Sequence, residues 1–232
     1  MVVGNGMLAN AFVKYKEYEK VIIFASGVSN SKEVKKKEFL REKKLLKSYS
    51  NIKNKRLIYF STCSIEDKSL EESFYIIHKI KMEEYIKKNF DNYIIFRLPN
   101  VIGNTENTNT FFGFFKKKII NECDLHIQEN AIRYIIDIDD LTKYLPGIIE
   151  EKLIDEKFSK TINIAFKNKM SVKDIVEIME NILNKKNTKK LKKEGSNYSL
   201  DNSIFLKYLK INNYIVDYKN YNEKTLKKYL KK

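Results

Sequence analysis

Three continuous apolar runs, separated by segments with helical patterning, constrain the fold of this chain most strongly. They extend from Val21 to Gly27, from Arg56 to Phe60 and from Tyr93 to Leu98. Continuous apolar character is typical of strands that are buried on both faces of a parallel sheet. A charged helical segment at 32–47 and a second around Tyr75 lie between the runs. We therefore predict an α/β fold, a doubly wound parallel sheet that binds ligands at the C-terminal ends of its strands.

A glycine-rich turn follows the first three residues. Met1–Val3 is predicted as a very short strand, and Gly4-Asn5-Gly6-Met7-Leu8-Ala9 leads into an apolar helical stretch that ends near Tyr15. Gly-x-Gly-x-x-Ala at a strand-to-helix turn is the dinucleotide fingerprint, because the glycines let the backbone approach a pyrophosphate and helix amides face the anion. We predict cofactor contacts from Gly4, Asn5, Gly6, Met7 and Leu8.

Tyr75 and Lys79 are the best candidates for proton transfer. Residues four apart lie on one face of a helix, and this pair follows the hydroxyl-rich segment Ser61-Thr62-Cys63-Ser64. A tyrosine ordinarily has a pKa of about 10, so we expect the ammonium of Lys79 to lower the pKa of Tyr75 toward neutral pH. A hydroxyl from Thr62 or Ser61 would hold the substrate oxygen. His78 points a quarter turn away from Tyr75, and we expect it to have a packing role.

The rest of the chain predicts a second, smaller unit. The expected elements are a polar loop at 104–109, a helix at 110–121, a strand at 131–137, a helix starting near Asp139, a strand at 161–166, an amphipathic helix opened by the capping box Ser171-Val172-Lys173-Asp174, a solvated basic linker at 185–194, and helical spacing near Leu226 and Leu230. We predict a dinucleotide-binding core at 1–165, including a substrate loop and helix at 104–132, and a small C-terminal α/β substrate subdomain at 166–232. In the helix at 32–47, Phe39, Leu40 and Leu46 are expected to face inward.

Charge and cysteine content argue against several classes of function. The 232 residues include 45 Lys and Arg against 30 Asp and Glu, a formal net charge of +15, which makes nucleic acid the first partner to consider. The lysines are scattered in short runs, so we expect a positive field that attracts anionic small molecules and no nucleic-acid site. The two cysteines and two histidines lack metal-ligand spacing, and we predict no metal.

Hydropathy predicts the cellular setting. No apolar stretch approaches the roughly 18 residues that cross a bilayer, and the N-terminus has no signal-peptide pattern. We predict a cytoplasmic protein without a membrane partner.

Taken in order, these motifs resemble the extended branch of the short-chain dehydrogenase/reductases, which are NAD(P)-dependent nucleotide-sugar epimerases, dehydratases and reductases. The resemblance covers about residues 1–185. Besides the glycine turn and Tyr75-x-x-x-Lys79, it rests on Phe24-Ala25-Ser26-Gly27, Phe60-Ser61-Thr62-Cys63, Arg97-Leu98-Pro99-Asn100-Val101-Ile102-Gly103 and the segment from Arg133 to Leu141. It implies a Rossmann-like fold and an enzyme that modifies a nucleotide-activated sugar, for example for a surface polysaccharide.

The resemblance also implies a role for each matching residue. Thr62, Tyr75 and Lys79 would be catalytic: Tyr75 as acid/base, Lys79 also as a ligand of the nicotinamide ribose, and Thr62 polarising the substrate oxygen. The further cofactor contacts would be Ala25, Ser26, Gly27, Ser61 and Pro99. The substrate contacts would be Thr62, Ser64, Asn100 and Arg133, whose guanidinium suits a diphosphate. A homodimer is implied as well.

The chain departs from that family pattern mainly on the cofactor side. About 18 residues separate the glycine turn from Phe24-Ala25, where the family fits two further strands and helices, so we expect a reduced number of strands. The acidic residue that would bind the ribose hydroxyls is then absent. Ser26, Ser29 and Lys32 could accept a 2'-phosphate, which favours NADP slightly over NAD. Thr62 and Tyr75 are also only 13 residues apart, so the loop between them is short.

Two alternatives to a redox enzyme follow from the missing segment before Val21. One is a degenerate relative that binds a sugar nucleotide or a partner without redox turnover. The other is a basic binding protein for another anionic ligand. Binding of a nicotinamide cofactor separates the enzyme from both.

Overall fold

A five-stranded parallel sheet forms the centre of the computed structural model, which describes residues 1–52, 54–151 and 159–231. The strands lie in the order β1 (Val2–Val3), β2 (Val21–Phe24), β3 (Arg56–Thr62), β4 (Tyr93–Leu98) and β8 (Lys160–Asn163). The prediction of an α/β fold with a parallel sheet of few strands is confirmed. Within the described part of the chain, β1 is an edge strand that pairs only with β2.

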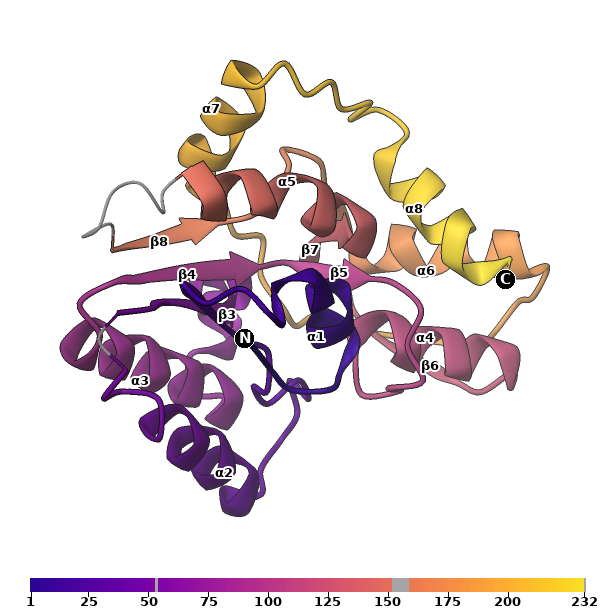
Figure 1. Ribbon diagram of the computed structural model, residues 1–232. Coiled ribbons are helices and arrows are strands. Elements are labelled where there is room, and N and C mark those ends of the chain that lie inside the picture. Colours follow the sequence, from indigo (N-terminus) through magenta and orange to yellow (C-terminus); the bar gives the residue numbers. More distant parts are fainter. Residues whose placement is uncertain (53, 152–158, 232) are drawn as a thin grey trace.

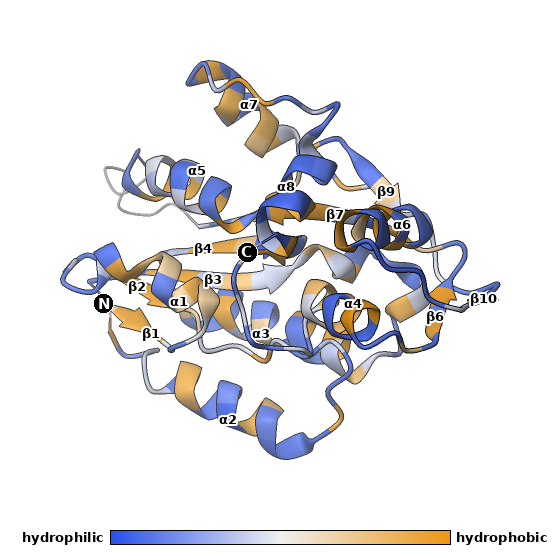
Figure 2. Cartoon of the chain, turned by 90° about the vertical axis from the view of Figure 1, so that its right-hand side faces the viewer, coloured by the Kyte–Doolittle hydropathy of each residue, from blue (hydrophilic) through white to orange (hydrophobic). Residues whose placement is uncertain are grey.

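Helices cover both faces of this sheet (Figure 1). The helices α2 (Lys36–Lys47) and α3 (Phe74–Asn89) lie on one face, and α1 (Met7–Ala11) and α5 (Ile138–Glu151) lie on the other. A 3-10 turn (Val13–Tyr15) follows α1, and two more (Cys63–Glu66 and Lys68–Leu70) connect β3 to α3. Because the sheet is covered twice, β2 and the middle parts of β3 and β4 are apolar, and they are coloured orange in Figure 2.

The two faces of the sheet belong to two hydrophobic clusters, because successive side chains of a strand point to opposite sides. Facing α2 and α3 are the buried side chains of Ile22, Leu57, Tyr59 and Ile95, together with Leu46, Met82 and Ile86 from the helices. Facing α1 and α5 are Ile23, Ile58, Phe60, Ile94 and Phe96, together with Phe12, Leu141 and Leu145. Packing on both faces holds the sheet in place, and with it the C-terminal ends of its strands.

Smaller sheets carry the second half of the chain. β5 (Asn100–Ile102) pairs in parallel with β7 (Ile132–Asp137), which pairs antiparallel with β9 (Lys169–Ser171). β6 (Leu125–Gln128) pairs in parallel with β10 (Lys189–Lys192). The helices here are α4 (Phe111–Ile120), α6 (Val172–Leu183), α7 (Ser203–Ile211) and α8 (Tyr221–Leu230). The predicted boundary at residue 165 stays a prediction. Two strands that follow residue 165, β9 and β10, pair with the earlier strands β7 and β6.

Local sequence signals determine where helix α6 begins and ends. The Ser171 hydroxyl accepts a hydrogen bond from the Asp174 amide at 3.0 Å, as the capping box predicts. The helix ends at Asn184, which adopts the left-handed conformation with φ of 52°. Its stripe of Val172, Ile175, Val176 and Met179 is buried in the core, so the interpretation of that stripe as packing is confirmed.

Five details of the sequence analysis differ from the structure. The α2 helix begins at Lys36 instead of 32, and Leu40 faces outward with 43% exposure, because its position lies on the side of α2 away from the sheet. The segment 189–192 is the strand β10 instead of linker, since the backbone of β6 offers it hydrogen-bond partners. The strand predicted at 161–166 ends at Asn163, and α7 was not predicted.

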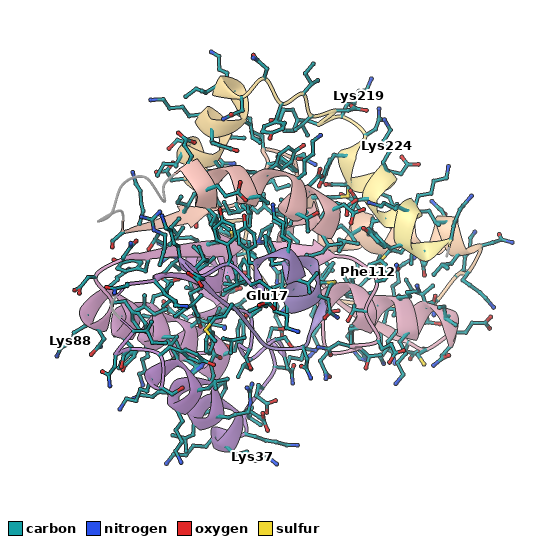
Figure 3. All side chains as sticks on the ribbon, viewed as in Figure 1. Glu17, Lys37, Lys88, Phe112, Lys219 and Lys224 are labelled. Carbon is teal, nitrogen blue, oxygen red and sulfur yellow. The ribbon has the colours of Figure 1, made fainter. Side chains whose placement is uncertain are left out.

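The lysines are spread over separate elements, as expected. Lys37 of α2, Lys88 of α3 and Lys219 near α8 project outward at distant parts of the periphery (Figure 3). The absence of a nucleic-acid partner stays a prediction. Among the described residues, no helix combines the length and the apolar character needed to cross a membrane.

Candidate active site

A cavity of about 500 Å³ opens at the C-terminal ends of β1 to β4, where an α/β sheet binds its ligands. Most of the residues predicted for the site line it. From the glycine turn and the second strand these are Asn5, Gly6, Met7, Leu8, Ala25, Ser26 and Gly27, and from the later strands and α3 they are Ser61, Thr62, Ser64, Tyr75, Lys79, Pro99 and Asn100. Of the predicted set, Gly4 and Arg133 do not line it.

Two glycines shape the first turn in different ways. Gly4 has a φ of 123°, and a Cβ there would lie 2.6 Å from the Ala25 carbonyl oxygen, so no other residue fits. A Cβ on Gly6 would meet no atom within 4 Å. Gly4 thus lets the chain turn close against the end of β2, while Gly6 leaves the cavity open beside α1.

Tyr75 lies in the first turn of α3, beside the end of β3. The Thr62 side chain lies near its hydroxyl, and Thr62 Oγ1 accepts from the Ser64 amide at 3.1 Å. The ammonium of Lys79, one helical turn further on, lies 5.9 Å from the centre of the Tyr75 ring. The structure therefore brings Thr62, Tyr75 and Lys79 together as predicted.

The pKa of Tyr75 is raised above its ordinary value of 10, contrary to the expected lowering. Burial is the main cause, because it removes water from the phenolate. The charge of Lys79 and the Thr62 side chain act in the opposite direction, and the carboxylate of Glu42 adds to the rise. Sequence spacing identified the cation but not the anion beside it.

That anion neutralises Lys79. The Lys79 ammonium is 3.1 Å from Glu42 Oε1 and donates to the Tyr59 hydroxyl at 3.1 Å. Both side chains of the ion pair are buried. Glu42 lies in the middle of α2, a helix interpreted from the sequence as a charged surface element, and no local signal distinguished it from the other acidic residues of that helix.

A second buried carboxylate supports the end of β3. Glu83 of α3 accepts from Ser61 Oγ at 2.7 Å and from Arg97 Nε and Nη2 at 2.9 and 2.8 Å. Arg97 Nη1 also donates to Glu66 at 2.7 Å. This network fixes Ser61, and with it the backbone next to Thr62, against α3.

The predicted substrate residues differ in how they are held. Asn100 lines the cavity and donates through Nδ2 to the Tyr134 carbonyl at 3.1 Å. Arg133 forms an ion pair with the buried Asp67 at 3.0 Å, and Asp67 also accepts from the Ser196 hydroxyl. The guanidinium of Arg133 is thus engaged within the protein and ties the segment after β3 to β7.

The cavity also has polar lining residues that the sequence analysis did not name. Thr105, Asn107, Asn109 and Thr110 belong to the substrate loop and helix predicted at 104–132, whereas Ser31 and Arg41 were missed. Asn107 Nδ2 donates to Ser29 Oγ at 3.1 Å and so joins the loop before α2 to the loop before α4. No Asp or Glu is among the described residues that line the cavity, and its cations are Arg41 and Lys79. This lining suits an anionic ligand.

The described residues contain no group of His, Cys, Asp and Glu side chains arranged to hold a metal ion. Cys63 is buried and donates through Sγ to the Arg97 carbonyl at 3.1 Å. Burial raises the pKa of its thiol. The candidate chemistry at the cavity therefore belongs to hydroxyl, phenol, amide and ammonium groups.

No protein-family model and no curated protein matches the sequence. The structure is similar to UDP-glucuronic acid 4-epimerase from Bacillus cereus solved with UDP-glucuronic acid and NAD, at 20% identity and a TM-score of 0.67, covering 96% of this chain and 78% of that one. It is also similar to UDP-N-acetylglucosamine 4-epimerase from Methanobrevibacter ruminantium M1, at 17% identity and a TM-score of 0.65, covering 94% and 77%.

A third similar structure is an NAD-dependent NDP-hexosamine 5,6-dehydratase involved in tunicamycin biosynthesis, at 15% identity and a TM-score of 0.67, covering 94% of this chain and 80% of that one. At these identities the likeness establishes the fold. The expected resemblance to the Rossmann-like fold of nucleotide-sugar epimerases and dehydratases is confirmed.

Proposed function

We propose that this protein is an NAD-dependent enzyme that acts on a nucleotide-activated sugar as an epimerase, dehydratase or ketoreductase. The observation that carries the proposal is the convergence of Thr62, Tyr75 and Lys79 with the glycine turn on one cavity of about 500 Å³. The fold supports it, because the three similar structures reported above are two nucleotide-sugar epimerases and one nucleotide-sugar dehydratase. A role in surface polysaccharide synthesis, a cytoplasmic location and a homodimer remain predictions.

The residues that line the cavity fit the nicotinamide half of the cofactor. The turn at Asn5 and Gly6 leaves open space that a pyrophosphate requires, and Ala25, Gly27, Ser61 and Pro99 surround the route from there to Tyr75. When bound, NAD supplies the acceptor and donor of a hydride. The similar UDP-glucuronic acid 4-epimerase was solved with NAD and the similar dehydratase is NAD-dependent, and they give no support to the predicted preference for NADP.

The residues of the chain supply proton transfer and orientation. A hydride can leave a carbon that carries a hydroxyl group only if the hydroxyl proton also moves, so a proton acceptor must lie within hydrogen-bonding distance. We assign this role to Tyr75, with Thr62 holding the same oxygen. Since the pKa of Tyr75 is raised, the phenol carries its proton in the free protein, so it can donate to a substrate oxygen when hydride is delivered, and it must first lose that proton to act as the acceptor when hydride is removed.

The substrate side of the proposal rests on hydrogen-bonding groups around the mouth of the cavity. Ser64, Asn100, Asn107, Asn109 and Thr110 line it, and amide and hydroxyl groups of this kind suit sugar hydroxyls. The similar epimerases bind UDP-glucuronic acid and UDP-N-acetylmuramic acid. We propose a sugar diphosphonucleotide as the substrate class here.

A sugar-nucleotide binding protein without redox turnover is the second candidate. The observation that favours it is the position of β1, which is two residues long and ends the sheet within the described residues. The sheet thus has no strand beyond β1 on which the adenosine half of a dinucleotide could rest. In this case the same cavity would hold a nucleotide sugar without the nicotinamide.

Cofactor titration tests the proposal. Purified protein is titrated with NADH and NADPH while the cofactor fluorescence is followed, and UDP-sugars are titrated separately by calorimetry. We expect micromolar binding of NADH that is weakened in Lys79→Met and retained in the control Lys87→Ala, which changes an exposed lysine of the same helix. Binding of a UDP-sugar without binding of either cofactor would establish the second candidate instead.

A further inference from the structure

The most enclosed polar cluster in the described structure surrounds Glu42. Its side chain is fully buried between α2, α3 and β3. Oε1 accepts from the Tyr59 hydroxyl at 2.6 Å and from the Lys79 ammonium at 3.1 Å. Oε2 accepts from the Val28 amide at 2.7 Å and lies 2.9 Å from His78 Nε2. Four partners thus hold one carboxylate in a single orientation.

This carboxylate is ionised. Burial opposes its ionisation, but the charge of Lys79 and the hydrogen bonds from His78, Tyr59 and Val28 outweigh that effect, and the pKa of Glu42 is lowered. The Glu42–Lys79 contact is therefore a buried ion pair. Such a pair is held rigidly because either charge alone would be strongly disfavoured there.

The Lys79 ammonium lies at the cavity wall, although the residue is only 2% exposed. An ammonium has three N–H donors, of which Glu42 and Tyr59 take two, while the lysine also lines the cavity. Gly27 makes this position possible, because a Cβ there would lie 2.7 Å from Lys79 Nζ and 3.1 Å from Glu42 Oε1. The absence of a side chain at residue 27 thus joins the cavity to the ion pair.

We propose that Glu42 is a positioning residue for the ligand of this cavity, because it fixes the Lys79 ammonium at the cavity wall with one N–H available to the hydroxyl groups of a bound ribose. This inference rests on the proposed function, since the ribose is that of the nicotinamide cofactor. Glu42 itself does not line the cavity and acts through Lys79.

A purely structural role for Glu42 predicts a different result. If the ion pair only ties α2 to α3, its removal lowers the free energy of unfolding, but the folded protein binds ligands as before. If Glu42 positions Lys79, its removal weakens binding only while Lys79 is present. A double-mutant cycle separates the two roles, because it measures whether two changes act through each other.

The cycle consists of the native protein, Glu42→Gln, Lys79→Met and the double variant, each titrated with NADH under conditions where circular dichroism shows it folded. We expect the Kd to rise about tenfold in each single variant, the usual effect of losing a hydrogen bond from a charged donor. In the double variant we expect no further rise. An unchanged Kd in Glu42→Gln, or a double-variant effect equal to the product of the single effects, would overturn the inference.

Amine labelling tests the position of Lys79 without any cofactor. The native protein, Glu42→Gln and the isosteric Tyr59→Phe are treated with an acetylating reagent, and the rate at each lysine is followed by peptide mass spectrometry. We expect faster labelling of Lys79 in Glu42→Gln than in Tyr59→Phe, and equal labelling of the exposed Lys87 in all three proteins. Tyr59→Phe is the matched control, because it removes one hydrogen bond of Lys79 and keeps the ion pair with Glu42.

The two experiments separate failure of the inference from failure of the proposed function. If Lys79 labels at the native rate in folded Glu42→Gln, Glu42 does not hold it and the inference is wrong. If the native protein binds no NADH while labelling is accelerated in Glu42→Gln, the proposed cofactor is wrong and the control of Lys79 by Glu42 is supported.

Discussion

The two walls of the cavity differ sharply in how firmly they are built. The inner wall, defined as the end of β3 with the facing side of α3, has buried polar groups at Ser61, Thr62 and Lys79, held by Glu42 and Glu83. The outer wall, defined as the turn after β1 with the loop before α2, has Asn5, Gly6, Ser29 and Ser31 exposed next to an edge strand of two residues.

Under the proposed function, the two walls have different roles: the inner wall performs the chemical step and the outer wall binds the cofactor. Catalytic groups must be held in place before the substrate arrives, because any reorganisation during the reaction adds to the barrier. Affinity for a cofactor can instead be spread over many weak contacts. Under the proposed function, the groups that require rigidity lie on the firmly held wall, and the wall that would supply cofactor affinity lies next to the short edge strand β1.

The largest effect is expected at the inner wall, from removal of the Tyr75 hydroxyl. Turnover of a nucleotide sugar by Tyr75→Phe should fall by about a hundredfold to ten-thousandfold, the usual contribution of general acid–base catalysis. NADH affinity should stay close to native, since the ring remains. The control is Tyr85→Phe, on the same helix and outside the cavity. Native turnover in Tyr75→Phe would show that the inner wall does not perform the chemistry.

The second prediction compares two carboxylates that share Arg97. Replacing the buried Glu83 by Gln should lower the free energy of unfolding by about 3 kcal/mol, because it leaves the partly buried guanidinium of Arg97 with less compensation. Glu66→Gln should cost less than about 1 kcal/mol, because Glu66 is 42% exposed and its ion pair is screened by water. Urea unfolding measures both. Equal losses would mean that the inner wall is no more firmly held than the surface.

The third prediction concerns acid. The pKa of Glu42 is lowered below its ordinary value of 4.5, so its contribution to stability is complete above that pH and decreases as the pH falls below it. The free energy of unfolding of the native protein should therefore fall more steeply below about pH 4.5 than that of Glu42→Gln. The control is Glu122→Gln, which changes an exposed ion pair. Parallel pH profiles for Glu42→Gln and the native protein would show that Glu42 is not held in its ionised form by the folded protein.

The smallest effect is expected at the outer wall, from Arg41. Its Nη1 donates to the Ser26 carbonyl and hydroxyl, both at 3.1 Å, and its side chain is 46% exposed. We expect Arg41→Gln to weaken NADH about fivefold, as for a solvent-screened charge, and to leave reduced nicotinamide mononucleotide unaffected, because that ligand lacks the adenylate.

Lys37→Gln is the matched control for Arg41, since Lys37 belongs to the same helix, does not line the cavity and projects outward at the periphery (Figure 3). Fluorescence titration with the two nicotinamide ligands gives the comparison. Equal weakening of both ligands by Arg41→Gln would place its effect at the nicotinamide end, and the division between the two walls would then be wrong.

Much of the site was predictable because its residues belong to local patterns. Gly4 and Gly6 could be placed at a turn, Tyr75 and Lys79 on one helix face, and Thr62 at a strand end from sequence spacing alone. The structure brings these groups together as expected, although their catalytic roles stay predictions. Arg133 was assigned by the same kind of motif, yet it is bound to Asp67, because a motif does not reveal what a side chain contacts across the fold.

The sequence by itself determined the alternation of strands and helices, since continuous apolar runs and helical spacing are properties of neighbouring residues. It also determined the glycine turn and the cap of α6. Only the tertiary structure decided that Glu42, 37 residues before Lys79, would neutralise that lysine and help to raise the pKa of Tyr75. The physical reason is that charges act through space in a buried, poorly screened site, where partners distant in sequence set the energy of each ionised group.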